Sequence, residues 1–145
     1  MNNLDRICAL IYHLNRDTSN LVLQKLLYFI QAYCLVVLNR AAFDEKIEAW
    51  MYGPVIPEAY YNVKRDENYY KDMSHDGLDD QIISAVQRIV TVFGSVSPFV
   101  LVDMTHTYDS WKKAWDLYGW NAEITNDAIR NCHIKRFREQ NGRIF

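Results

Sequence analysis

The segment from Leu21 to Leu38 constrains the fold more than any other part of the chain. Its apolar side chains recur at helical spacing, and they occupy most of the circumference of the helix rather than one face. They are Leu21, Leu23, Leu26, Leu27, Phe29, Ile30, Tyr33, Cys34, Val37 and Leu38. A helix with so wide an apolar surface needs neighbours on several sides, so we expect it at the centre of the fold.

The same periodicity predicts further helices on both sides of this segment. They cover residues 4–15, 57–64, 78–93, 98–105, 109–118 and 125–137. Ser97-Pro98 predicts a helix start with a hydroxyl cap, and Thr125 can cap the last helix. Residues 65–77 are mostly polar and charged and predict a loop. No linker or repeat divides the 145 residues, so we expect one compact, mainly helical domain over residues 1–145.

A short stretch near residues 43–53 departs from the helical pattern. Apolar and polar or aromatic residues alternate there: Ile47, Ala49 and Met51 with Glu48, Trp50 and Tyr52. This alternation permits a short strand or hairpin. Gly53-Pro54 then predicts a turn, and Pro57 suits the first turn of the helix that follows. The predicted fold class is therefore mainly α, with a small β element near residues 43–53.

Aromatic content and charge favour a protein that binds another protein. The chain has ten tyrosines and four tryptophans, side chains that fill cores and also dominate binding hot spots. Its net charge of −2 provides no basic field for nonspecific nucleic-acid binding. Acids concentrate in residues 58–80 and bases in residues 130–145. These stretches are either two solvated faces or a charged docking surface.

The sequence predicts no metal, no cofactor and no disulfide. Cys8, Cys34 and Cys132 are widely spaced within apolar helical patterns, as expected of buried, reduced thiols in a cytoplasmic protein. No signal peptide is visible. The longest uninterrupted apolar stretch, residues 32–38, is far shorter than the roughly 20 residues of a membrane span, so no membrane association is expected.

One pair of residues could serve an enzyme. Asp103 and His106 are three apart and can share a helix face, as the catalytic pair of a small hydrolase or nucleic-acid enzyme would. A structural hydrogen bond is the commoner explanation of such a pair. The two helices around Gly94 are spaced like a helix-turn-helix, but the second presents mainly apolar residues, so nucleic-acid binding is not expected.

Three segments together resemble the Panacea domain of SocA-like antitoxins, a family also described as phage-associated proteins. They are the run from Leu23 to Phe29 followed by Ala32-Tyr33, the run from Phe43 to Pro57, and Met104-Thr105-His106 with Trp111 shortly after. The resemblance covers roughly residues 4–117. Two positions differ from the family pattern. Ser110 stands where proline often precedes the tryptophan, and Phe93 stands where tyrosine often precedes glycine.

The resemblance implies an antitoxin, active in toxin–antitoxin systems and phage defence, that neutralises a cognate toxin encoded beside it by direct contact. A proteolytic adaptor or phage accessory protein that binds a protease or host protein is the alternative within the family. The candidate partner-binding residues are Trp50, Tyr52, Gly53, Pro54, Pro57, Tyr60, His106 and Trp111. Tyrosine and tryptophan offer large contact areas with few rotamers to freeze, and glycine and proline can fix the bend between them. The oligomeric state is not predicted.

Overall fold

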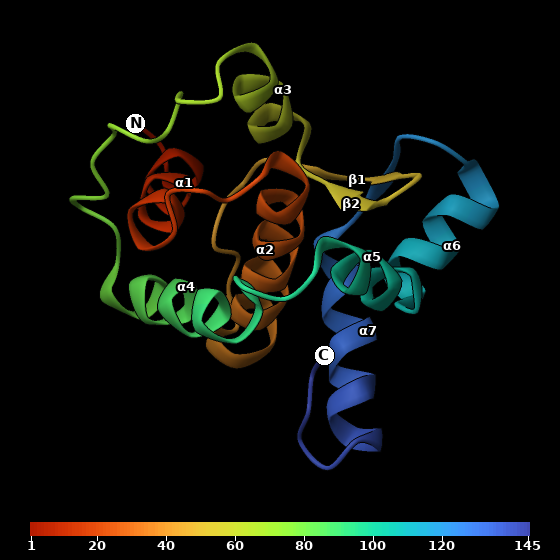
Figure 1. Cartoon of the computed structure of the whole chain (residues 1–145). Coiled ribbons are helices and arrows are strands. Elements are labelled where there is room, and N and C mark those ends of the chain that lie inside the picture. Colours follow the sequence, from red (N-terminus) through yellow and green to blue (C-terminus); the bar gives the residue numbers. More distant parts are fainter.

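A computed structural model describes residues 1–145 as seven α-helices and a small sheet (Figure 1). The elements are α1 Asn3–Leu14, α2 Asn20–Tyr33, a π-helical segment η1 Cys34–Leu38, β1 Ile47–Trp50, β2 Gly53–Val55, α3 Pro57–Arg65, α4 Asp80–Phe93, α5 Pro98–His106, α6 Asp109–Tyr118, β3 Ala122–Ile124 and α7 Asn126–Glu139. The predicted class, mainly α with a small β element near residues 43–53, is confirmed.

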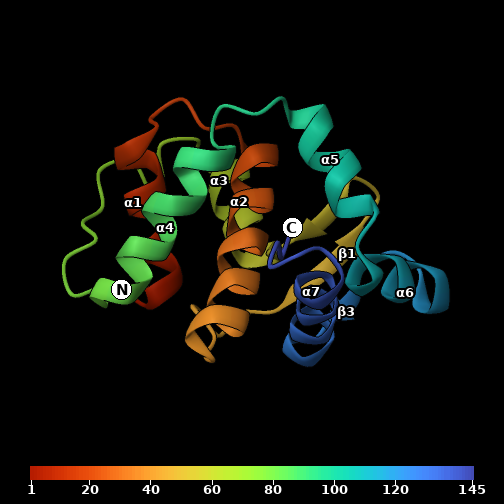
Figure 2. The same cartoon turned by 90° about the horizontal axis from the view of Figure 1, so that it is seen from below.

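Helix α2 lies at the centre of the molecule, as its apolar circumference predicts. It packs against α3, α4, α5, α7 and strand β2. Figures 1 and 2 show α1 and α4 on one side of α2, and α5 and α7 on the other. Every side chain from Val22 to Ala32 is buried. This one helix therefore organises a hydrophobic core that extends from Leu4 to Cys132.

The predicted helix 21–38 is not uniform along its length. Its last five residues form the π-helix η1, which ends at Asn39 with a left-handed φ of 58°. Residues 20–38 together are long and apolar enough to cross a membrane, although polar residues interrupt the apolar run within them. In the fold, 72% of that window is buried inside the protein, as in the core helix of a globular domain.

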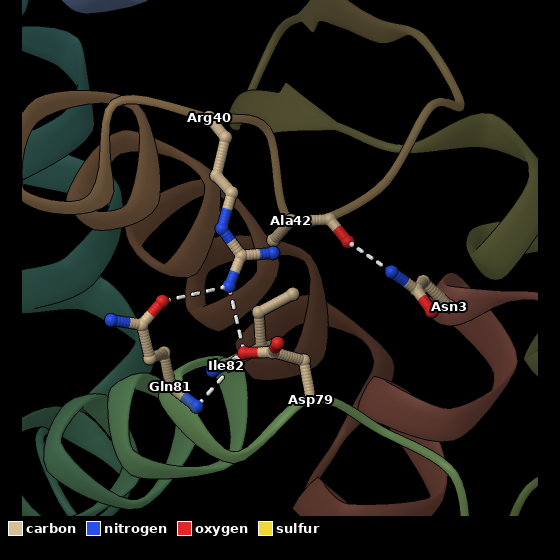
Figure 3. Close-up of polar contacts among 6 residues, drawn as sticks. All are labelled: Asn3, Arg40, Ala42, Asp79, Gln81 and Ile82. Carbon is tan, nitrogen blue, oxygen red and sulfur yellow. Dashed lines mark hydrogen bonds and ion pairs between the residues drawn. The ribbon is translucent and has the colours of Figure 1, made fainter.

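Polar contacts fix the chain that leaves η1 (Figure 3). The Nη2 atom of Arg40 donates to Oδ1 of Asp79 at 2.7 Å and to Oε1 of Gln81 at 3.1 Å. Asp79 also caps the start of α4 by accepting the backbone N–H of Gln81. The side-chain amide of Asn3 in α1 donates to the carbonyl oxygen of Ala42 at 3.2 Å. The segment before the sheet is thereby held to both α1 and α4.

The sheet differs from the prediction in two respects. Its order is β2-β1-β3, fully antiparallel, and β3 comes from residues far along the chain with no recognisable alternation. Gly53 and Pro54 were expected to form the turn, but they lie in β2, and the turn is Met51-Tyr52. Met51 therefore sits in the turn and is exposed rather than following Ile47 and Ala49 into the core.

The remaining expectations concern caps, thiols and the loop. Thr125 caps α7 as predicted, whereas α5 begins at Pro98 without a capping bond from Ser97. All three cysteines are buried, as predicted, and carry free thiols. Residues 66–79 form the predicted loop, and the fully buried Tyr70 stacks on Tyr12 at a ring-centroid distance of 6.4 Å, which anchors this loop to α1.

Candidate functional site

The β1–β2 hairpin is the place where most of the predicted partner-binding residues meet. Figure 1 shows it on the opposite side of α2 from α4, next to α3, α5 and α6. β1 contacts α6, and β2 contacts α2 and α5. Trp50 ends β1, Tyr52 lies in the turn, and Pro57 opens α3 as its first residue. Residues distant in sequence therefore converge on one hairpin.

Trp50 lies at the middle of a group of partly exposed aromatic rings. Its ring centroid is 4.9 Å from that of Tyr60, 6.0 Å from Tyr61 and 5.9 Å from Trp120. Tyr52, which is 62% exposed, borders the same pocket as Trp50, Tyr60 and Trp120. We refer to Trp50, Tyr52, Tyr60, Tyr61 and Trp120 as the aromatic face. Tyr61 and Trp120 are not in the predicted set of site residues. Tyr61 directly follows Tyr60, which is in that set, whereas nothing local in the sequence links Trp120 to the hairpin.

His106 and Trp111 bind the backbone of the hairpin and are not part of the aromatic face. Nε2 of His106 donates to the carbonyl oxygen of Met51 at 2.9 Å, and Nε1 of Trp111 donates to that of Trp50 at 2.9 Å. The two rings lie 4.3 Å apart, and Trp111 stacks on Trp115. Both side chains thus donate their ring N–H groups to the backbone of the hairpin. In this arrangement they are positioning residues.

Asp103 and His106, which their spacing would allow to pair, do not contact each other through a hydrogen bond. Asp103 is exposed and forms no hydrogen bond with His106, whose Nε2 is occupied by Met51. No group of three or more His, Cys, Asp or Glu side chains is arranged to hold a metal ion.

Gly53 and Pro54 bring the backbone of β2 down onto α2. Gly53 has a φ of 111°, and a Cβ there would lie 2.6 Å from Oγ1 of Thr105 and 2.9 Å from Cε of Lys25. The carbonyl oxygen of Pro54 accepts a hydrogen bond from Nζ of Lys25 at 2.9 Å. Only glycine permits both the backbone angle and this close approach.

Lys25 is the functional candidate that sequence reasoning missed. It is 0% exposed, and burial lowers its pKa to about 7. Lysine is almost never fully buried unless it is paired, and no salt bridge involves Lys25. The available signal was a lysine within an otherwise apolar stretch of the central helix, between Leu23 and Leu26.

A pocket of about 510 Å³ separates the start of α2 from the hairpin. It is lined by Asn20, Leu21, Gln24, Lys25, Trp50, Met51, Tyr52, Val55, Tyr60 and Trp120. The two amides in this set bind within the fold. Asn20 donates to the carbonyl oxygen of Tyr60 at 3.1 Å, and Gln24 accepts the backbone N–H of Ile56 at 2.9 Å. The pocket is thus mainly apolar and aromatic, and Lys25 is its single charged residue.

Comparison with known proteins identifies the family of this chain. The family model described as antitoxin SocA-like, Panacea domain, matches residues 23–112, which include all eight predicted site residues but not Trp120. The antitoxin SocA of Caulobacter vibrioides (strain NA1000 / CB15N) is 33% identical over 157 aligned positions, covering 94% of this chain and 79% of that protein. No solved structure matches the chain. The chain therefore belongs to the family of SocA-like antitoxins that carry the Panacea domain.

Proposed function

We propose that this protein is the antitoxin of a toxin–antitoxin pair and that it neutralises its cognate toxin by direct contact. Membership of the SocA-like family supports the role, as does a relative that is itself named an antitoxin. In this proposal residues 1–145 act as one domain in the cytoplasm, and they act by binding rather than by catalysis. The toxin is the product of a neighbouring gene.

The observation that supports direct binding as the mode of neutralisation is the aromatic face. Its five rings come from β1, the hairpin turn, α3 and the segment after α6, and they surround one pocket or abut its wall. Trp120 is 58% exposed and Tyr61 is 43% exposed. Large aromatic side chains left at the surface beside a pocket are typical of binding hot spots. Their few rotatable bonds limit the entropy lost when a partner docks.

The test is co-expression of this chain with the adjacent gene, followed by mixing of the purified proteins. We expect the neighbouring product to arrest growth alone, to be tolerated when this chain is present, and to co-purify with it. The toxin's activity should then be lost on mixing the two purified proteins, with no protease added.

Two other outcomes would contradict this proposal in different ways. Rescue in cells that disappears when one protease is deleted, without neutralisation of the purified toxin, would identify a proteolytic adaptor instead. Rescue that is lost in a folded Asp103→Asn variant, together with a turnover activity that this variant also lacks, would point to the small hydrolase or nucleic-acid enzyme.

A further inference from the structure

Lys25 is an amine without a counter-ion at the boundary of the aromatic face. Its one hydrogen bond goes to the carbonyl oxygen of Pro54, whereas an ammonium group has three N–H donors. No carboxylate lines the pocket that Lys25 borders. Glu48, the acidic residue on β1, accepts a hydrogen bond from Nε1 of Trp50 at 3.0 Å. The fold therefore leaves donor capacity on Nζ that none of its own acidic groups uses.

We propose that the pocket between α2 and the β1–β2 hairpin binds the carboxylate of an acidic side chain of the partner protein, with Lys25 as its ion-pair partner. Leu21, Val55 and the aromatic walls would hold the carbon atoms of that side chain. A carboxylate supplies both the charge and the acceptor lone pairs that Nζ lacks in the free protein. This inference rests on the proposed function, because it names the chemistry of a contact in the pocket that the aromatic face borders.

Access to Nζ requires movement of the β1–β2 hairpin, because Gly53 and Pro54 of β2 lie against the Lys25 side chain. Lys25 has no exposed surface in the free protein, so an incoming carboxylate has to displace the residues that cover it. Met51 and Tyr52 form the turn, border the pocket and are 60% and 62% exposed. Side chains this exposed can change rotamer at small cost, whereas α2 beneath them is fixed in the core.

A purely structural role for Lys25 is the competing explanation. In that case the amine only ties β2 to α2 through Pro54, and a neutral donor would serve as well. Burying a cation for one carbonyl hydrogen bond is costly, and replacing such a group by an apolar one of similar shape is often neutral or stabilising. A preference for negatively charged ligands separates the two explanations, since a structural tie would show none.

The probe is phenylacetate, compared with the uncharged phenylacetamide, on the isolated protein with ¹³C-labelled lysine. We expect phenylacetate to shift the Cε resonance of Lys25 and to raise its pKa, with a dissociation constant in the millimolar range that suits one isolated side chain. Phenylacetamide should bind at least roughly 10-fold more weakly, a difference of about 1.4 kcal/mol. This comparison in the unaltered protein does not depend on the folding of any variant.

Two variants complete the test. Lys25→Met should remove the preference for the acid. Lys64→Met is the matched control and should retain this preference. Lys64 is an exposed lysine near the same pocket, with its Nζ 5.8 Å from the Tyr60 ring centroid. Equal binding of acid and amide, no binding of either, or an undiminished acid preference in Lys25→Met would each overturn the proposal. Micromolar affinity for phenylacetate would indicate a small-molecule site and overturn the assignment to a partner's side chain. Because no toxin is present, these results are independent of whether the antitoxin role holds.

Discussion

The hydroxyl group of Tyr28 lies 2.8 Å from Nε2 of His133, and this contact joins the central helix to α7. Nδ1 of His133 faces the carbonyl oxygen of Ile144, which can only accept, so Nδ1 carries the proton and Nε2 accepts from Tyr28. The Tyr28 oxygen then accepts from Ser110 at 2.6 Å. Ser110 stands where the family often has proline, which could not make this bond. With the ring nitrogens in these roles His133 is neutral, which is the form that its burial favours.

The first prediction concerns acid stability. Burial lowers the pKa of His133 to about 4, against 6.5 in the unfolded chain, although its hydrogen bond to Ile144 offsets part of the shift. Below pH 6.5 the unfolded state binds the proton more readily, so the stabilisation is complete above pH 6.5 and is lost as the pH falls toward 4. The expected loss is about 3 kcal/mol of unfolding free energy.

Urea denaturation between pH 4 and 7.5 measures this loss. Carboxylates titrate in the same range, so the comparison is with His133→Gln, which should show a smaller dependence on pH, and with His13→Gln, an exposed site, which should match the unaltered protein. Parallel pH profiles for the unaltered protein and His133→Gln would contradict the prediction.

The second prediction concerns Lys25 on the alkaline side. Its pKa of about 7 lies well below 10.5, so above pH 7 the unfolded state binds more protons than the folded state and stability rises with pH. Measured as the difference from Lys25→Met, the expected gain is about 1.5 kcal/mol between pH 7 and 8.5. The three buried cysteines begin to ionise in the unfolded chain over the same range, and they lower the stability of both proteins equally, so the difference isolates Lys25. Parallel pH profiles of the unaltered protein and Lys25→Met would show that the amine stays charged.

The third prediction concerns the approach of β2 to α2. Gly53→Ala should lower the free energy of unfolding by about 2 kcal/mol or more, because the new Cβ meets Thr105 Oγ1 at 2.6 Å in addition to the backbone strain. Gly119→Ala is the matched control, since Gly119 has a φ of 77° but nothing lies within 4 Å of its Cβ position. Equal losses in both variants, measured by urea denaturation, would mean that only the backbone angle matters.

Sequence periodicity predicted the helices well because most of them owe their stability to one buried face, which leaves a periodic trace. The central position of α2 followed from its apolar circumference alone. Strand β3 left no such trace, because Ala122–Ile124 is three residues long and pairs with a strand about 75 residues away in sequence. The predicted turn is misplaced because Gly-Pro pairs are typical of turns, whereas glycine at position 53 is required by the close approach of β2 to Lys25 and Thr105.

The candidate site was predictable only in part. The string of residues near Trp50 and Tyr60 indicated a contact surface, and the structure places these two rings side by side. Trp120 joins them because β3 pairs with β1, which is a tertiary relationship. Lys25 lies in the segment that carries the family resemblance, but its missing counter-ion becomes visible only when the burial of its neighbours is known.

The last prediction tests the aromatic face against the toxin. Tyr52→Ala and Trp120→Ala should each weaken binding of the toxin by roughly 10-fold or more while leaving the melting temperature nearly unchanged, because both side chains are mostly exposed in the free protein. Phe99→Ala is the control: Phe99 is 79% exposed at the start of α5, outside the aromatic face, and its removal should leave binding intact. Calorimetric titration and growth rescue are the two measurements.

Tyr60→Ala gives a separate comparison, since Tyr60 is half-buried against Trp50. If Tyr60→Ala loses stability in step with rescue, that ring belongs to the core and only the outer rings form the contact. If Tyr52→Ala and Trp120→Ala are both stable and both rescue fully, the toxin binds another face, and the acidic loop at residues 66–79 and the basic residues of α7 become the next surfaces to examine.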